Sequence, residues 1–282
     1  MEQEQGRNSL QDAFMHLSWQ LLEVTQNAAI AAARKAGKGD KNLADQAAVD
    51  AMRSTLDHMT GFQSNIKIGE GERDDAPMLF IGERLGRGHI SIDIAVDPLE
   101  NTNATADLKP GAVCVLAASA QGGLIEASDT YMDKLCVGKE AAPYIDILQP
   151  PEENIYRIAK ALGREDLSQL TVTILDRPRH EELIRRVRAT GARVNLIADG
   201  DLMPCIFTCF KGAGVHAVMG IGAAPEGVIS ATAIKLLGGG MQAVFKPKND
   251  ADRERLLRMG IKLDQVYTPE TLAPGKNLIF CA

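Results

Sequence analysis

Residues 91–102 read SIDIAVDPLENT, and the first seven of them alternate as a half-buried β-strand does. Branched apolar residues occupy one face of this strand, while the other face carries carboxylates and an alanine. Pro98 has no N–H to donate, so we expect the strand ladder to end there. Thr102 is then expected at the start of a helix. The stretch therefore predicts a strand that ends in a polar turn.

The segments around this strand change from a helical to an alternating pattern. Apolar residues at helical spacing predict helices over 10–35 and 43–59. Residues 112–118 and 123–127 are expected to form a pair of strands, which 131–137 would extend.

A second pattern begins after two consecutive prolines at 150–151. Helices and strands alternate from residue 152 to 245, which is typical of a largely parallel sheet covered on both faces. A last short strand is expected at 277–281. The sequence therefore predicts an α/β protein with an N-terminal α+β lobe over 1–165 and a C-terminal lobe with a mostly parallel sheet over 166–282.

Composition and charge narrow the classes of function. The chain has 282 residues, 45% of them hydrophobic, and a formal net charge of -6. A negative chain is a poor partner for nucleic acid, which favours a basic face. No apolar stretch approaches the roughly 20 residues that span a bilayer, so no membrane partner is expected. Five cysteines without framework spacing favour reduced thiols and a cytoplasmic location.

The turn after the 91–97 strand carries the strongest chemical signal. Asp97 and Glu100 are three residues apart and can converge on one cation at the end of the strand. Thr102 follows, where its hydroxyl can hold a water and nearby helix amides can face a phosphate. A plain helix cap is the alternative interpretation of Asp-Pro-x-Glu.

Residues 69–75 read GEGERDD and place four carboxylates around two glycines. These charges repel one another unless a cation lies among them. A solvated acidic loop is the alternative. The segment directly follows a short strand expected at 65–69, however, and ligands of α/β sheets gather at the carboxyl ends of strands.

Charged residues recur at the other expected junctions of strands and helices. Lys41 and Asp45 share a helix face, and Arg177 with Arg179 can bind a second, non-reacting phosphate. Ordinary surface charges are the alternative for each group. The full set at these junctions is Lys41, Asp45, Arg177, Arg179, Asp199, Asp201 and Glu226. Carboxylates without a histidine or thiolate in ligand spacing select hard cations, so Mg²⁺ or Mn²⁺ is the expected cofactor.

These motifs together resemble the class II fructose-1,6-bisphosphatases, one branch of the lithium-sensitive, metal-dependent sugar and inositol phosphatases. The matching stretches occur in family order, and those that carry the resemblance are GDKNLADQAAVDAMR, IGEGERDDAPMLFIGE, DIAVDPLENTN, YMDKL, DRPRHEELI, ADGDL and GIGAAPEGVISA. The chain is most similar to the cyanobacterial form, which also accepts sedoheptulose-1,7-bisphosphate. The resemblance implies layers in the order α-β-α-β-α, and a homo-oligomer, a dimer or a tetramer.

The resemblance also implies roles for individual residues. The N-terminal lobe would supply most of the metal-binding carboxylates, and the C-terminal lobe would bind the substrate. The implied metal ligands are Asp45, Glu70, Asp97, Glu100 and Glu226. The implied catalytic residues are Thr102, which would orient or deprotonate the attacking water, with Asp74 and Glu70 of the acidic loop. The implied substrate-binding residues are Lys41, Glu100, Asn101, Thr102, Tyr131, Arg177, Arg179, Asp199, Asp201 and Glu226.

Two features depart from the family pattern. The family usually has glycine at the position of Asn101, and asparagine is the best substitute if that residue has a positive φ. Family members also continue beyond the position that matches Phe280, so the sequence fits either a shortened relative or an incomplete chain.

The implied activity is hydrolysis of the 1-phosphate of fructose-1,6-bisphosphate, of sedoheptulose-1,7-bisphosphate or of both. One alternative is a phosphatase for another phosphate monoester, such as an inositol or nucleotide phosphate. The other is a catalytically impaired paralogue that binds a sugar phosphate as a regulator or scaffold.

Overall fold

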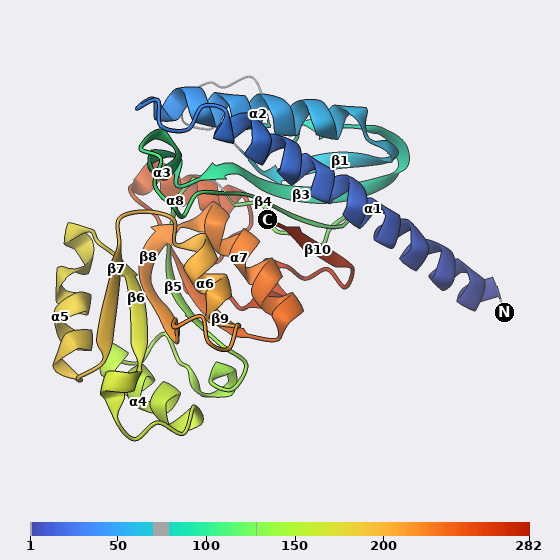
Figure 1. Ribbon diagram of the computed structural model, residues 1–282. Coiled ribbons are helices and arrows are strands. Elements are labelled where there is room, and N and C mark those ends of the chain that lie inside the picture. Colours follow the sequence, from blue (N-terminus) through green and yellow to red (C-terminus); the bar gives the residue numbers. More distant parts are fainter. Residues whose placement is uncertain (1, 70–78, 128) are drawn as a thin grey trace. The chain divides into compact units, whose positions relative to one another are not determined.

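The computed structural model describes residues 2–69, 79–127 and 129–282, which form two compact units (Figure 1). The first unit contains the chain up to Leu124 together with Gly275–Ala282, and the second contains Ile125–Pro274. The boundary that the sequence pattern placed at residue 165 falls inside the second unit. The difference arises because residues 131–137 pair within the second unit's sheet. None of the helices in the described ranges combines the length and apolar character needed to span a bilayer.

The first unit contains a five-stranded mixed sheet in the order β10-β4-β3-β1-β2. Among the strand pairs that the described residues form in this sheet, β1–β3 is parallel and the others are antiparallel. The prediction of a strand at 123–127 was wrong, and β10 instead pairs antiparallel with β4. The expected strand at 277–281 is confirmed as β10. The strands are β1 (Thr60–Ile68), β2 (Arg84–Leu85), β3 (Arg87–Glu100), β4 (Val113–Ala120) and β10 (Leu278–Cys281).

Two long helices, α1 (Glu2–Ala33) and α2 (Lys41–His58), pack on this sheet, and α3 (Thr102–Ala106) follows β3 (Figure 1). The apolar stripe of α1 recurs every three or four residues and is buried, as helical periodicity predicts. Its members are Phe14, Leu17, Leu21, Val24, Ala28 and Ala32. They share one core with Ile92, Ile94 and Val96, so the apolar face expected for this strand is confirmed.

The second unit contains another five-stranded sheet, in the order β7-β6-β8-β5-β9. The four strands that the sequence pattern placed in this lobe, β6, β7, β8 and β9, run in the same direction, so the mostly parallel sheet is confirmed. The additional strand β5 lies between β8 and β9 and is antiparallel to both. The β8–α7–β9 crossover still makes β8 and β9 parallel to each other, but with β5 inserted between them. The strands are β5 (Tyr131–Val137), β6 (Thr171–Leu175), β7 (Arg193–Ile197), β8 (Ala217–Ala223) and β9 (Gly240–Lys246).

Helices cover both faces of this second sheet. The helices α4 (Pro151–Ala161) and α5 (Glu181–Ala189) share a core with Leu135 and Val137 of β5. The intervening residues of β5 face α6 (Leu202–Phe207) and α7 (Ala224–Leu237), as strand alternation requires. Each unit thus has the alternating helix and sheet layers of an α/β fold.

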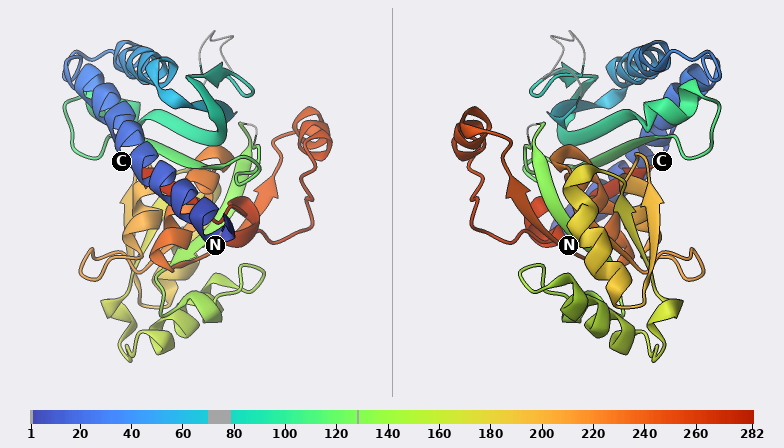
Figure 2. Two further views of the ribbon diagram at one scale, coloured as in Figure 1. Left: turned by 90° about the vertical axis from the view of Figure 1, so that its right-hand side faces the viewer. Right: turned by 90° about the vertical axis from the view of Figure 1, so that its left-hand side faces the viewer.

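The polar tail beyond β9 contains two helices that the sequence pattern did not indicate, α8 (Asp250–Arg258) and α9 (Pro269–Leu272). Figure 2 shows α8, in red-orange, beyond the β9 end of its sheet. Asn249 caps α8 by accepting a hydrogen bond from the backbone N–H of Asp252. Short 3₁₀ turns complete the structure at Ala142–Tyr144, Leu167–Gln169 and Pro178–His180.

Candidate active site

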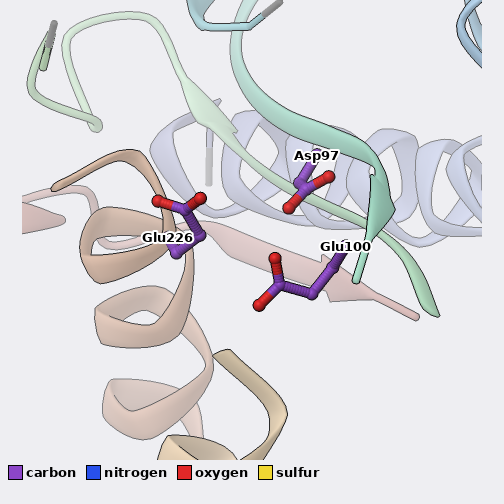
Figure 3. Close-up of side chains that lie close together, drawn as sticks. All are labelled: Asp97, Glu100 and Glu226. Atoms are coloured by element: carbon purple, nitrogen blue, oxygen red, sulfur yellow. The ribbon is translucent and has the colours of Figure 1, made fainter. Parts of the chain in front are cut away.

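A β-bulge brings the two carboxylates of the 97–100 turn together. Asp97 pairs with Val115 and Glu100 pairs with Val113, so β3 advances by three residues where β4 advances by two. Side chains three apart on a regular strand point to opposite faces, and the additional residue of a bulge removes that offset. The carboxylate oxygens of Asp97 and Glu100 lie within 4.8 Å of each other as a result (Figure 3).

The bulge also explains how β3 accommodates its proline. Pro98 was expected to end the ladder, but β3 continues to Glu100. A bulge leaves one residue unpaired, and proline is tolerated there because it has no N–H to offer. The N–H of Leu99 turns back to the Oδ1 atom of Asp97 at 3.1 Å, while the Leu99 side chain enters the core. The two carboxylates are therefore fixed by backbone geometry.

Asn101 links this bulge to α3 in the left-handed conformation, with φ 62° and ψ 55°. Its side-chain amide donates to the carbonyl oxygen of Gly111 at 3.5 Å. The condition under which asparagine replaces glycine well is therefore met. Thr102 is the first residue of α3 and is half-buried, so the expected helix start is confirmed.

The loop between α1 and α2 is tied to α3 by its glycines. The N–H groups of Gly37 and Gly39 donate to the carbonyl oxygens of Thr105 and Ala106, each at 3.0 Å. The side chain of Asp40 then caps α2 by accepting from Leu43 N. The helix that carries Lys41 and Asp45 therefore begins at a position fixed against the Asn101–Thr102 turn.

Asp45 and Asp97 both affect the pKa of the Cys114 thiol. Lys41 is exposed at the start of α2, and Asp45 follows one turn later, half-buried. Burial, followed by the negative charges of Asp97 and Asp45, raises the pKa of the Cys114 thiol to about 12. The three carboxylates of the first unit, Asp45, Asp97 and Glu100, offer only hard oxygen donors. This donor chemistry fits Mg²⁺ or Mn²⁺.

Glu226 lies in the first turn of α7 in the second unit, where a carboxylate is favoured by the helix dipole (Figure 3). Lys134 of β5 is fully buried, and its ammonium group lies 2.6 Å from the carboxylate of Asp201. Burial alone would lower the pKa of Lys134, but the charges of Asp201 and Glu226 contribute to raising it. This buried lysine was not among the predicted site residues, because the motif YMDKL does not indicate which face of the sheet the lysine lies on.

Gly222 is required beside this ion pair. A Cβ atom at Gly222 would lie 2.2 Å from the Oδ2 atom of Asp201 and 2.7 Å from the Nζ atom of Lys134. Gly222, the second glycine of GIGAAPEG, therefore allows the ion pair of Lys134 and Asp201 to pack directly against the backbone of β8.

Tyr131 begins β5 and lies close to two basic side chains. The guanidinium of Arg179 lies 4.9 Å from the centre of the Tyr131 ring, and the ammonium of Lys248 lies 4.7 Å from it. Two N–H groups of Arg179 donate to the carbonyl oxygen of Ile221 at 3.1 and 2.7 Å, which fixes the plane of the guanidinium. The structure therefore brings together Tyr131 and Arg179, which were predicted to bind substrate, and adds Lys248, which was not.

Of the remaining predicted residues, one pair is described by the structure and two residues are not. Arg177 lies 3.7 Å from Asp199, a loose ion pair in which both side chains are partly exposed. Glu70 and Asp74 lie outside the described residues.

Comparisons with known proteins agree with this geometry. A family model described as bacterial fructose-1,6-bisphosphatase, glpX-encoded, matches residues 15–282. Three relatives are named D-fructose 1,6-bisphosphatase class 2/sedoheptulose 1,7-bisphosphatase. The protein of Synechocystis sp. is 46% identical, covering 94% of this chain and 84% of its own length. The protein of Synechococcus sp. (strain JA-3-3Ab) is 44% identical with the same coverage, and that of Thermosynechococcus vestitus is 46% identical, covering 93% and 83%. The chain therefore belongs to the family of glpX-encoded bacterial fructose-1,6-bisphosphatases.

Proposed function

We propose that this chain hydrolyses the 1-phosphate of fructose-1,6-bisphosphate, of sedoheptulose-1,7-bisphosphate or of both. The observation that carries the proposal is the bulge of β3, which holds the carboxylates of Asp97 and Glu100 within 4.8 Å directly before Thr102. The names of the relatives point to the same pair of substrates.

The reaction would use Mg²⁺ or Mn²⁺. The proposed ligands are Asp45, Glu70, Asp97, Glu100 and Glu226. Support comes from the converging carboxylates of Asp97 and Glu100 and from the shared effect of Asp97 and Asp45 on Cys114. Bound divalent cations neutralise the phosphate, lower the pKa of a water and stabilise the leaving oxygen.

The chain's own groups would orient the reactants. The hydroxyl of Thr102 would orient or deprotonate the attacking water, with help from Asp74 and Glu70 of the acidic loop. Backbone N–H groups in the first turn of α3 would face the reacting phosphate, since helix N-termini favour anions. Asn101 supports an active enzyme over an impaired paralogue, because it adopts the left-handed conformation open to glycine without distorting α3.

The sugar and its second phosphate would be bound largely by the second unit. Lys41, Glu100, Asn101, Tyr131, Arg177, Arg179, Asp199, Asp201 and Glu226 form the proposed binding set, with Thr102 at the reacting phosphate. The anchored guanidinium of Arg179 next to Tyr131 supports a role at a phosphate, because planar N–H donors match phosphate oxygens.

Phosphate release from a panel of substrates tests this function. The panel contains fructose-1,6-bisphosphate, sedoheptulose-1,7-bisphosphate, inositol 1-phosphate and a nucleoside monophosphate, each with Mg²⁺, Mn²⁺ or EDTA. We expect metal-dependent release from one or both sugar bisphosphates. Preference for another monoester, or sugar phosphate binding without turnover, would overturn the proposal in favour of the corresponding alternative.

We also propose a cytoplasmic homo-oligomer, either a dimer or a tetramer. Five free cysteines favour a reducing compartment. Met15 and Trp19 expose 63% and 70% of their surface on α1, and such apolar side chains favour a protein interface. Sedimentation of the wild-type chain and of Trp19→Glu tests the assembly, which should weaken in the variant; a wild-type monomer would contradict it.

A further inference from the structure

The β9 end of the second unit carries a lysine with no role in the proposed function so far. Lys248 lies two residues beyond β9 and reaches back over the ring of Tyr131. Lys246 is the direct cross-strand partner of Tyr131 and is exposed. Together with Arg179, these lysines concentrate positive charge around one tyrosine at the start of β5.

The backbone of Lys248 is held by a buried carboxylate. Asp252, which is 7% exposed, accepts a hydrogen bond from the N–H of Lys248 at 2.9 Å and another from the hydroxyl of Thr130. Burying a carboxylate is costly unless it is hydrogen-bonded, and these donors satisfy it. Since Thr130 immediately precedes Tyr131, Asp252 fixes Lys248 relative to the tyrosine.

The side chain of Lys248 is also oriented. Its ammonium group donates to the backbone carbonyl of Asp129 at 2.9 Å and lies 3.4 Å from the Oδ1 atom of the same residue. The side chain is 25% exposed, which leaves it accessible to a ligand.

We infer that Lys248 binds the distal, non-reacting phosphate of the sugar bisphosphate together with Tyr131 and Arg179, and that Asp252 is its positioning residue. The inference rests on the proposed function for the identity of the ligand. Its chemistry is that of a phosphate dianion, which is matched by a fixed guanidinium, a phenol hydroxyl and an ammonium group within one cluster.

Lys248→Met tests the contact by comparing substrates with and without the distal phosphate. We expect KM for fructose-1,6-bisphosphate to rise about ten- to hundredfold, as for the loss of a charged hydrogen bond, with kcat nearly unchanged. Hydrolysis of fructose 1-phosphate, which lacks the distal phosphate, should not change. Lys248→Arg should retain most of the affinity, and Lys211→Met, at a lysine 94% exposed in the same unit, serves as the control. An equal loss with both substrates, or no loss with either, would overturn the inference.

Binding of fructose 6-phosphate by calorimetry gives a readout that needs no turnover. Lys248→Met should weaken it by the same factor as KM. If the wild-type chain binds fructose 6-phosphate through Lys248 but releases no phosphate from the bisphosphate, the proposed function fails and the inference stands. If the wild-type chain releases phosphate and Lys248→Met binds fructose 6-phosphate as tightly, the inference fails alone. Absence of both wild-type activities overturns both.

Asp252→Asn separates positioning from folding. We expect a smaller loss of fructose 6-phosphate affinity than in Lys248→Met, and almost no added loss when the two changes are combined, because positioning acts only through the lysine. Additive losses would show that Asp252 does not act through Lys248. Thermal unfolding of each variant identifies any that fail to fold, and if Lys248→Met is one of them, Lys248→Gln replaces it in each comparison.

Discussion

The ammonium group of Lys134 and the carboxylate of Asp201 form a buried ion pair at 2.6 Å, with 0% and 9% of their side chains exposed. The pair connects the middle of β5 to the N-terminal end of α6, on the face of the sheet that also carries Glu226. The ion pair with Lys134 therefore fixes the position of the Asp201 carboxylate.

Lys134→Met should destabilise the protein strongly. The variant leaves the charge of Asp201 buried without its main partner, which typically costs about 3–5 kcal/mol. Urea unfolding measures the change. Adding Asp201→Asn should recover part of the loss, since the buried charge is then removed as well. Lys211→Met changes an exposed lysine and should stay within about 0.5 kcal/mol of wild type. A Lys134→Met variant as stable as this control would show that the pair contributes little.

Substitutions at Asn101 should show how much the left-handed conformation of this residue affects the stability of the protein. Asn101→Ala forces an ordinary residue into the left-handed region, and we expect it to lower the free energy of unfolding by about 1–2 kcal/mol. Asn101→Gly fits that region and should change stability by less than about 1 kcal/mol. Thermal unfolding of both variants gives the comparison. Equal stability of the alanine and glycine variants would mean that the turn relaxes out of this conformation.

His180 should make stability depend on pH. Its Nε2 atom accepts from the N–H of Ile221 at 2.8 Å, and Nδ1 contacts the carbonyl oxygen of Leu175 at 2.8 Å. Nδ1 therefore donates, and the ring is neutral. Burial, as the largest cause, lowers the pKa of His180 in the folded state. Protonation thus favours the unfolded chain, and the stabilisation is complete above the unfolded value of about 6.5 and is lost as pH falls from there toward the folded pKa.

Urea unfolding at pH 7.5 and pH 5.5 measures this effect in wild type and in His180→Gln. The wild-type chain should lose more stability between these two values than the variant does. His58→Gln, at an exposed histidine on α2, should keep the wild-type pH dependence. Parallel pH profiles for wild type and His180→Gln would exclude His180 as the cause.

The sequence allowed much of the local structure to be predicted, but not the strand partners. The apolar period of α1 reflects burial on one face, and the alternation of Ser91–Asp97 separates the side chains that share the core with α1 from those on the other face of β3, so a single segment records each pattern. The place of β5 between β8 and β9 depends on residues about a hundred positions away, so its own pattern could not indicate it.

The same limit applies to the candidate site. Asp97, Glu100 and Thr102 are close in sequence, so their turn could be identified, although the bulge that aligns the carboxylates could not. Lys248 could not be found, because its position depends on pairing between β5 and β9 and on the buried carboxylate of Asp252.

The most direct test of the central claim is the rate of phosphate release from fructose-1,6-bisphosphate as a function of Mn²⁺ concentration. Wild type, Glu100→Gln and Glu254→Gln are compared, the last at an exposed glutamate in the middle of α8. We predict that release requires Mn²⁺, that Glu254→Gln follows the wild-type curve, and that Glu100→Gln is inactive or needs at least about tenfold more Mn²⁺, since it loses a charged oxygen ligand. Release that persists in EDTA, or a Glu100→Gln curve that coincides with wild type, would contradict a metal-dependent phosphatase centred on the β3 bulge.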